Sequence, residues 1–332
     1  MDWRPLPEIL DAEQLVERAL HRAAKKRSGA SDNAARKLSS LSDNLAATLG
    51  AIVDDFPSLD QLHPFDRDIV DLSVGLDELR QSLGGVDWAR KQLQKLGGRF
   101  TSQAARARGE RARQLQKQGY GRLTSVVRQV ADRLEFLRDA RSVLRKLPAV
   151  DPETPLVAMA GAPNVGKSSL VRAISTGRPV VREYPFTTKS VSLGHITARY
   201  QKIQVLDTPG LLDRPDAERN NIEKQGLAAL EHLAPAIAFV TDASGTSGYP
   251  LEVQQALRAE LRARYPQAPW LEVRGKFDLE QEAPLGEGAL AVSATEGTGV
   301  DELKQAVIAM LFFPAQSRQR VTADFGIPLR CR

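Results

Sequence analysis

Residues 161–168 have the residue types and spacing of a loop that binds phosphate. The segment reads Gly-Ala-Pro-Asn-Val-Gly-Lys-Ser, follows the apolar run 156–160 and precedes an amphipathic stretch, so it matches strand, G-x-x-x-x-G-K-S/T, helix. Its two glycines permit backbone conformations that a Cβ would hinder, and successive N–H groups can then face phosphate oxygens at a helix N-terminus. Lys167 would reach the outer phosphates, and the Ser168 hydroxyl would bind Mg²⁺. The expected nucleotide-binding residues here are Gly161, Ala162, Pro163, Asn164, Val165, Gly166, Lys167, Ser168 and Ser169.

A second motif follows the apolar run 203–206, where the sequence reads Asp207-Thr208-Pro209-Gly210. An acidic residue at the end of a strand suits the coordination shell of Mg²⁺. A glycine near it can offer its N–H to a γ-phosphate and move when that phosphate leaves. Asp-x-Pro-Gly also occurs in ordinary turns. Its place one strand after the phosphate loop favours a nucleotide site that includes all four residues, with Asp207 as a metal ligand.

Between these motifs, the segment Tyr184 to Ser190 has few core signals and contains the pair Thr187-Thr188. A threonine here could close over the nucleotide, binding Mg²⁺ with its hydroxyl and the γ-phosphate with its N–H. The spacing does not choose between the two threonines, and a plain solvent-exposed loop is the alternative reading.

Recognition of a guanine base normally uses Asn-Lys-x-Asp after a strand, and here the run 270–273 leads into Arg-Gly-Lys-Phe-Asp. Asp278 can accept hydrogen bonds from the two donors on the edge of guanine, and the stem of Lys276 can lie along the base. Gly275 stands where asparagine is expected, so one side-chain contact is missing. The expected base contacts come from Lys276, Asp278, Ser293 and Ala294, the last two through a backbone N–H at the end of the last apolar run.

The second half of the chain has the pattern of an α/β domain that positions these motifs. After a two-proline linker at 148–152, apolar runs alternate with helical stretches, which predicts a mostly parallel sheet with helices on both faces. Ligands bind beyond the carboxyl ends of the strands in such folds, and the motifs lie there. The expected strands are 156–160, 192–200 (an edge strand), 203–206, 236–241, 269–273 and 289–292, and the expected helices lie near 167–176, 218–233, 252–264 and 301–312.

The first 146 residues predict an all-α helical bundle. Apolar residues recur at three and four positions over 38–56, over 69–83 and, in the longest series, over 123–144, as in helices with one buried stripe. A shorter helix is expected over 12–26. The segment 99–117 predicts a helix whose positive charge surrounds most of its circumference.

Positive charge is concentrated before the phosphate loop. Residues 1–87 carry 10 Lys/Arg against 16 Asp/Glu, residues 88–146 carry 16 against 4, and residues 147–332 carry 20 against 21. A polar helix of this kind is often only a solvated face or a connector. The alternative is a surface for nucleic-acid phosphates, although the sequence holds no folded RNA-binding motif and base-specific readout is not supported.

Length and composition limit the number of domains and the class of protein. The 332 residues predict an N-terminal helical domain over 1–150 with the basic stretch 88–146, a nucleotide-binding domain over 151–315, and a short tail over 316–332. No apolar run approaches the ~18 residues of a membrane span, and the N-terminus lacks a signal-peptide pattern. The single cysteine, Cys331, cannot form an internal disulfide, which suits a reducing cytoplasm. A cytoplasmic monomer without membrane contact is expected.

These motifs in order resemble the Obg-type branch of translation-factor-like P-loop GTPases. A longer set narrows the resemblance to the nucleolar GTP-binding protein 1 family and its archaeal relatives, over roughly residues 55–310. That set includes His63-Pro64-Phe65, Leu147-Pro148, Phe186-Thr187-Thr188-Lys189-Ser190, Leu211-Leu212-Asp213-Arg214-Pro215 and Gly248-Tyr249.

The resemblance implies a GTPase that works in assembly of the large ribosomal subunit, with the helical domain contacting rRNA. It favours Thr188 as the switch threonine, so that Lys167, Thr188 and Gly210 would act in hydrolysis while Ser168, Thr188 and Asp207 hold Mg²⁺. In related GTPases, the asparagine matching Asn164 helps to place K⁺ against the phosphates. Leu211 cannot orient a water molecule as glutamine does in Ras-like enzymes, which implies slow intrinsic turnover.

Two rival functions follow from the same residues. One is a binding module that holds nucleotide with little or no turnover. The other is a P-loop ATPase with relaxed base specificity, because Gly275 removes one hydrogen-bonding group and such a loss weakens discrimination. Asp278 favours GTP over this second rival.

Overall fold

The protein divides into two compact units in this computed structural model. The helical unit comprises residues 3–62 and 73–145, and the sheet unit comprises residues 1–2, 63–72 and 146–332. The structure describes residues 1–25, 33–147, 149–182, 191–198, 201–207, 212–213, 224, 227–228, 230–233 and 235–312.

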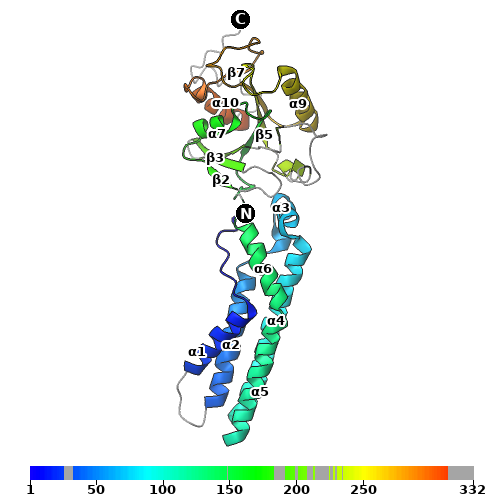
Figure 1. Ribbon diagram of the computed structural model, residues 1–332, viewed down its shortest axis with the longest axis vertical. Helices are drawn as coiled ribbons and strands as arrows, with labels where there is room; N and C mark the ends of the chain where they lie inside the picture. Colours follow the sequence, from blue (N-terminus) through cyan, green and yellow to red (C-terminus); the bar gives the residue numbers. More distant parts are fainter. Residues whose placement is uncertain are drawn as a thin grey trace. The chain divides into compact units, whose positions relative to one another are not determined.

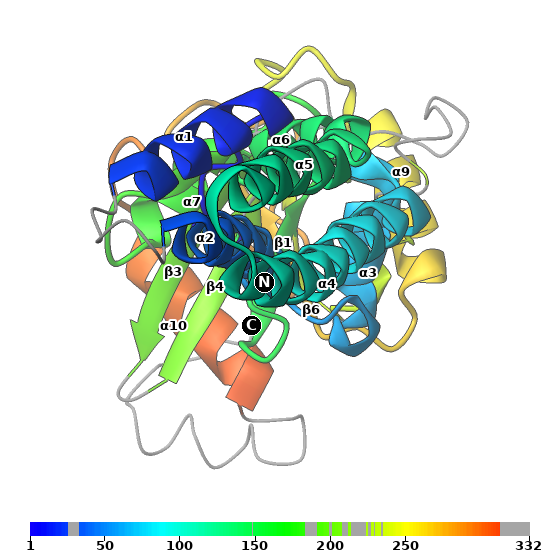
Figure 2. The same ribbon diagram turned by 90° about the horizontal axis from the view of Figure 1, so that it is seen from below.

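The helical unit is a bundle around buried leucines, as predicted. Its elements are α1 (Ala12–Lys25), α2 (Asn33–Asp54), the short η1 (Leu59–Gln61), α4 (Leu76–Arg106), α5 (Gly109–Arg128) and α6 (Ala131–Leu144) (Figure 1). Helix α2 packs against α1, α4 and α5, and Figure 2 shows these helices side by side. The buried stripe of α2 consists of Leu38, Leu41, Leu45 and Leu49. Other helices of the unit contribute the buried side chains of Leu79, Leu93, Leu123 and Leu134.

A glycine ends the helix that was expected to continue from 69 to 83. Helix α3 (Pro64–Val74) stops before Gly75, whose φ is +78°, and α4 begins at Leu76. The apolar spacing runs on across this break, so the prediction of one helix was wrong. A positive φ at Gly75 turns the chain at low steric cost.

Two further boundaries differ from the sequence prediction. The expected polar helix over 99–117 is two helices, because Ala107 is extended and Gly109 has a φ of +58° at the start of α5. The prediction of one helix with positive charge around most of its circumference was therefore wrong. The long apolar series over 123–144 is also interrupted, at Gln129–Val130, between α5 and α6.

The sheet unit contains a mostly parallel seven-stranded sheet, which confirms the predicted fold class. In spatial order the strands are β2-β3-β4-β1-β5-β6-β7. Strand β1 pairs in parallel with β4 and β5, and the parallel pairing continues through β6 to β7. The bounds are β1 (Leu156–Ala160), β2 (Val180–Arg182), β3 (Val191–Ala198), β4 (Gln201–Asp207), β5 (Ala236–Thr241), β6 (Trp270–Arg274) and β7 (Leu290–Ala291).

The predicted edge position of the strand at 192–200 was wrong. Strand β3 is antiparallel to β4 on one side and to the short β2 on the other, so β2 takes the edge. Three residues are too few to show a period in the sequence, and β2 was not expected.

Helices cover the sheet and form its core. Helices α7 (Lys167–Ile174) and α10 (Val300–Phe312) pack together, and their apolar side chains join a cluster that includes Ala236, Ala238 and Val240 of β5. Successive side chains of a strand point to opposite faces. The alternate residues of β5 therefore face the other side, where α9 (Leu251–Arg264) packs on this strand. No helix within the described residues is both long and apolar enough to span a bilayer.

Candidate nucleotide-binding site

The loop between β1 and α7 has a backbone that depends on its glycines. Gly161 has a φ of +135°, Asn164 of +61° and Gly166 of +102°. A Cβ on Gly161 would overlap the carbonyl oxygen of Val240, so no larger residue fits there without displacement. Gly166 caps α7 without a side-chain hydrogen bond, which leaves the first N–H groups of that helix available to a ligand.

Lys167 lies inside this loop. Its Nζ donates to the carbonyl oxygens of Gly161 and Ala162, each at 2.8 Å, and the residue is only 6% exposed. A buried ammonium needs such partners because desolvation otherwise disfavours its charge. The loop thus holds a positive charge at the position where the G-x-x-x-x-G-K-S/T motif binds phosphate oxygens.

Ser168 and Asp207 are brought together from different elements. Asp207 ends β4, the parallel neighbour of β1, and accepts a hydrogen bond from the Ser168 hydroxyl. Burial raises the pKa of Asp207, and the charge of Asp213 adds to that. The hydrogen bond from Ser168 and the charge of Lys167 oppose the shift. The Oδ1 atom of Asp207 is buried and has no hydrogen-bond partner among the described residues.

A divalent cation fits this pair. The cation would neutralise the negative charge of the buried Asp207 carboxylate. Ser168 and Asp207 would supply oxygen ligands, which Mg²⁺ prefers. The described residues contain no group of three His, Cys, Asp or Glu that could hold a metal on their own. Phosphate oxygens and water would therefore have to complete the shell, as is usual for Mg²⁺ in nucleotide sites. A cavity of about 370 Å³ opens beside Ser168 and Asp207 and is also lined by Arg172 and Arg178.

The predicted base-binding segment begins where β6 ends, and its lysine is anchored. Lys276 has a φ of +51°, and its Nζ donates to Asp242 Oδ2 and Thr246 Oγ1, each at 2.8 Å. Asp278 is exposed two residues later. The backbone N–H of Ser293 donates to the carbonyl of Thr298 at 2.9 Å, so Ala294 is the better of the two predicted N–H donors to a base.

Gly275 lies where the predicted base-binding segment approaches the phosphate loop. Its N–H donates to Thr241 O at 2.8 Å. A Cβ there would lie 2.8 Å from the carbonyl oxygen of Val165, inside the phosphate loop, and 3.2 Å from Val240 Cγ1. From its position in the sequence, this glycine is interpreted as the loss of an asparagine. The structure shows a close approach of two backbone segments that the glycine makes possible.

Asp242 is a site residue that sequence reasoning missed. It directly follows β5 and is 1% exposed. Its backbone N–H and carbonyl form hydrogen bonds with the buried amide of Gln254. Burial alone would raise the pKa of Asp242, but hydrogen bonds from Lys276 and Ser244 outweigh it, so the pKa lies below its usual value. Its signal in the sequence was the series Asp-Ala-Ser-Gly-Thr that directly follows the apolar run 236–241.

The remaining predicted residues lie outside the described part of the chain. These are Thr187, Thr188, Thr208, Pro209, Gly210 and Leu211. Their roles stay predictions.

Comparison with known proteins assigns both regions to families. Residues 3–151 match the NOG1 N-terminal helical domain, and residues 156–269 match the family described as 50S ribosome-binding GTPase. The protein MJ1408 of Methanocaldococcus jannaschii is 38% identical over 69% of this chain and 64% of its own length.

Other relatives include nucleolar GTP-binding protein 1 of two eukaryotes. The Arabidopsis thaliana protein is 36% identical over 68% of this chain and 34% of its own length, and the Candida glabrata protein is 30% identical over 91% and 49%. The chain thus spans about a third to two thirds of the lengths of these relatives. A crystal structure of nucleolar GTP-binding protein 1 from Plasmodium falciparum is 26% identical, with a TM-score of 0.45 over 54% of this chain and 95% of that chain.

The helical domain, the GTPase domain that follows it and the identities of 30–38% agree with the resemblance seen in the sequence. The chain belongs to the family of nucleolar GTP-binding protein 1.

Proposed function

We propose that this protein binds GTP, hydrolyses it slowly to GDP and phosphate, and acts as a nucleotide-dependent switch in assembly of the large ribosomal subunit. The observation that supports this most directly is the phosphate loop. It holds the Lys167 ammonium between two carbonyls and lies beside the Ser168–Asp207 pair. Membership in a GTPase family supports the same reading.

In this proposal the residues of the loop hold the nucleotide phosphates in place, and a bound cation neutralises part of the negative charge of these phosphates. The N–H groups at the start of α7 and the Lys167 ammonium bind the phosphate oxygens. Ser168 and Asp207 hold Mg²⁺, which when bound neutralises charge on the phosphates. Thr188 and Gly210 close over the γ-phosphate and are released after hydrolysis.

Guanine is proposed as the base because its edge offers two donors to Asp278. Lys276 is fixed by Asp242 and Thr246, so its stem is held beside the base. The N–H of Ala294 would meet guanine O6. Gly275 keeps a P-loop ATPase as the second candidate, because no side chain at this position contacts the base.

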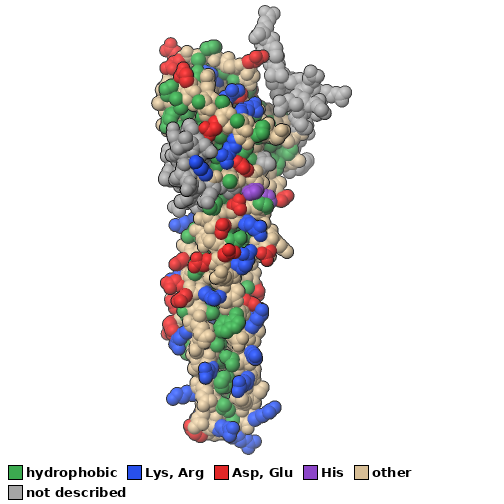
Figure 3. All heavy atoms as spheres, turned by 90° about the vertical axis from the view of Figure 1, so that its right-hand side faces the viewer, with side chains coloured by type: hydrophobic (Ala, Val, Ile, Leu, Met, Phe, Trp, Pro, Cys, Tyr) green, Lys and Arg blue, Asp and Glu red, His purple; other side chains and the backbone are tan. Residues whose placement is uncertain are grey.

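The helical unit is proposed to contact rRNA through the part of the basic stretch 88–146 that lies around the turn between α4 and α5. Figure 3 shows Lys and Arg side chains predominating at the end of the helical unit drawn at the bottom. Arg113 lies 3.9 Å from Glu110, but seven other basic side chains here form no ion pair with an acidic group of the described residues. The phosphates of RNA could therefore pair with them and displace counterions. The exposed residues concerned are Lys95, Arg99, Arg106, Arg108, Arg111, Lys117 and Arg122.

Phosphate release from GTP, measured with Mg²⁺ and with or without precursors of the large subunit, tests the proposed activity. We expect slow release by the protein alone and faster release with the particles. Absence of release under both conditions would identify a binding module instead. Equal release from ATP would identify the ATPase.

The proposed switch is tested by co-sedimentation with large-subunit particles in GTP, GDP and a non-hydrolysable analogue. We expect association to differ between the triphosphate and diphosphate states. Identical association in all three would contradict the switch.

A further inference from the structure

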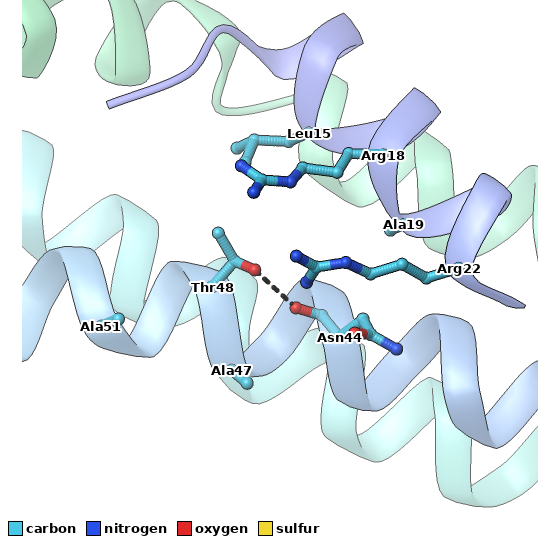
Figure 4. Close-up of a pocket in the computed structure, with 8 residues that line it drawn as sticks. All are labelled: Leu15, Arg18, Ala19, Arg22, Asn44, Ala47, Thr48 and Ala51. Carbon is cyan, nitrogen blue, oxygen red and sulfur yellow. Dashed lines mark hydrogen bonds between the residues drawn. The ribbon is translucent and has the colours of Figure 1, made fainter. Parts of the chain in front are cut away.

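A pocket of about 320 Å³ lies between α1 and α2 in the helical unit. Helix α1 lines it at positions i, i+3, i+4 and i+7, and α2 lines it at the same spacing (Figure 4). This spacing is that of two helix faces in contact, where apolar side chains normally fill the seam. Here four of the eight positions are polar and three are alanine, and the seam stays open. The lining residues are Leu15, Arg18, Ala19 and Arg22 of α1 and Asn44, Ala47, Thr48 and Ala51 of α2.

Two arginines give the pocket its charge. Both arginine side chains lie in the space between α1 and α2, with the guanidinium of Arg18 beside Leu15 and that of Arg22 beside Thr48 (Figure 4). Neither forms an ion pair or hydrogen bond with another described residue, although residues 1–87 carry an excess of acidic groups. Like charges four residues apart on a helix repel each other. An anion between them would relieve this repulsion.

The rest of the pocket can take a flat, partly apolar group. Leu15 and Ala19 are buried at its base, and the small side chains of Ala47 and Ala51 leave space on the opposite wall. Asn44 uses its NH₂ group on the carbonyl of Ser40, while the described residues show no donor to its Oδ1. Thr48 donates to the carbonyl of Asn44 at 2.8 Å and can still accept a hydrogen bond. The pocket therefore offers two guanidinium groups for an anion and an apolar floor for a flat group. The oxygens of Asn44 and Thr48 can accept hydrogen bonds from donors on the edge of that group.

We propose that this pocket binds one unpaired nucleotide of RNA, with the phosphate on Arg18 and Arg22 and the base against the apolar floor. Arginine binds phosphate through a planar fork of donors, and unpaired RNA bases are bound by stacking and by hydrogen bonds to their edges. The inference rests on the proposed contact between the helical unit and rRNA, and it adds a preference for unpaired over paired RNA. The basic stretch at the α4–α5 turn supplies no such preference, since it acts on phosphates alone.

The test uses the full-length protein with GDP and Mg²⁺ and two fluorescein-labelled RNA hairpins of equal length. One hairpin has a fully paired stem and the other has a single bulged purine. Affinities are measured by anisotropy near physiological salt. Arg22→Gln removes one of the two charges, and Ala47→Leu fills the pocket without changing charge. Ala24→Leu, at an exposed position of α1 outside the pocket, is the matched control. Urea unfolding verifies that each variant is folded.

We expect the wild type and Ala24→Leu to bind the bulged hairpin about tenfold more tightly, a difference of about 1.4 kcal/mol in the free energy of binding. In Arg22→Gln and Ala47→Leu this preference should fall to about twofold or less. Affinity for the paired hairpin should be unchanged in Ala47→Leu, because the basic stretch is intact.

Three outcomes would overturn the inference. Equal binding of both hairpins by the wild type would contradict it while leaving the proposed RNA contact in place. Retention of the preference in Ala47→Leu would place the selective contact elsewhere. Binding of neither hairpin would refute the RNA part of the proposed function and the pocket assignment with it.

Discussion

Replacing Gly275 with asparagine, the residue expected after this strand in guanine-binding sites, should weaken nucleotide binding rather than restore a contact. A Cβ at this position would lie 2.8 Å from Val165 O and 3.2 Å from Val240 Cγ1. The first contact is with backbone, so it cannot be relieved by a change of rotamer. Val165 belongs to the phosphate loop, and any displacement is transmitted to the groups that bind phosphate.

The size of the effect follows from overpacking a buried position, which costs about 1–3 kcal/mol. If about half of that is expressed in binding, GDP affinity falls by about two- to tenfold, since 1.4 kcal/mol corresponds to a factor of ten. The remainder lowers the free energy of unfolding. Gly275→Ala carries the same Cβ without the amide and should show most of both losses.

Titration with labelled GDP and urea unfolding of both variants measure these losses. Gly286→Ala is the control, because no atom lies within 4 Å of a Cβ placed there and its φ is not positive. Unchanged stability together with equal or tighter GDP binding in Gly275→Asn would refute the close-approach argument and restore the reading of a missing contact.

Three other predictions concern charges at the site. The raised pKa of Asp207 means that its ionised form is disfavoured in the folded, nucleotide-free protein, so stability is lost as pH rises past the ordinary carboxyl range. Asp207→Asn should therefore raise the urea midpoint at pH 7, by an amount that vanishes at acid pH, while weakening Mg²⁺-dependent GDP binding; a lower midpoint would contradict this. The lowered pKa of Asp242 has the opposite effect on stability. The ionised carboxylate stabilises the fold at neutral pH, and this stabilisation is lost as pH falls through the lowered pKa. Asp242→Asn should cost about 2 kcal/mol in urea unfolding at pH 7, the usual size for a hydrogen bond to a charged group, and an unchanged free energy of unfolding would show that Lys276 does not depend on it. Asn164 predicts faster GTP hydrolysis in K⁺ than in Na⁺, and equal rates would exclude that role.

The phosphate loop was predictable residue by residue because its motif is local. The spacing of Gly161 and Gly166 placed the end of β1 and the start of α7, and the structure has both where the motif requires them. The parallel sheet followed in the same way from apolar runs separated by helical stretches.

Features set by single turns or by distant contacts could not be predicted. The apolar period crosses Gly75 and the break at Gln129–Val130 without interruption, because a turn of a few residues need not disturb spacings of three and four. The role of Asp242 depends on its approach to Lys276, 34 residues later, which no local pattern records. The role of Gly275 depends likewise on the nearness of Val165, which is 110 positions away by number and adjacent in the fold.

Competition of GTP and ATP against labelled GDP, in Mg²⁺ with the full-length protein, tests the central claim most directly. The claim is that a P-loop site with Asp278 and an anchored Lys276 selects guanine although Gly275 supplies no side chain. It predicts displacement by GTP at concentrations at least about tenfold below those needed for ATP, as one well-made hydrogen-bonding edge provides. Displacement by both nucleotides at the same concentration would contradict it.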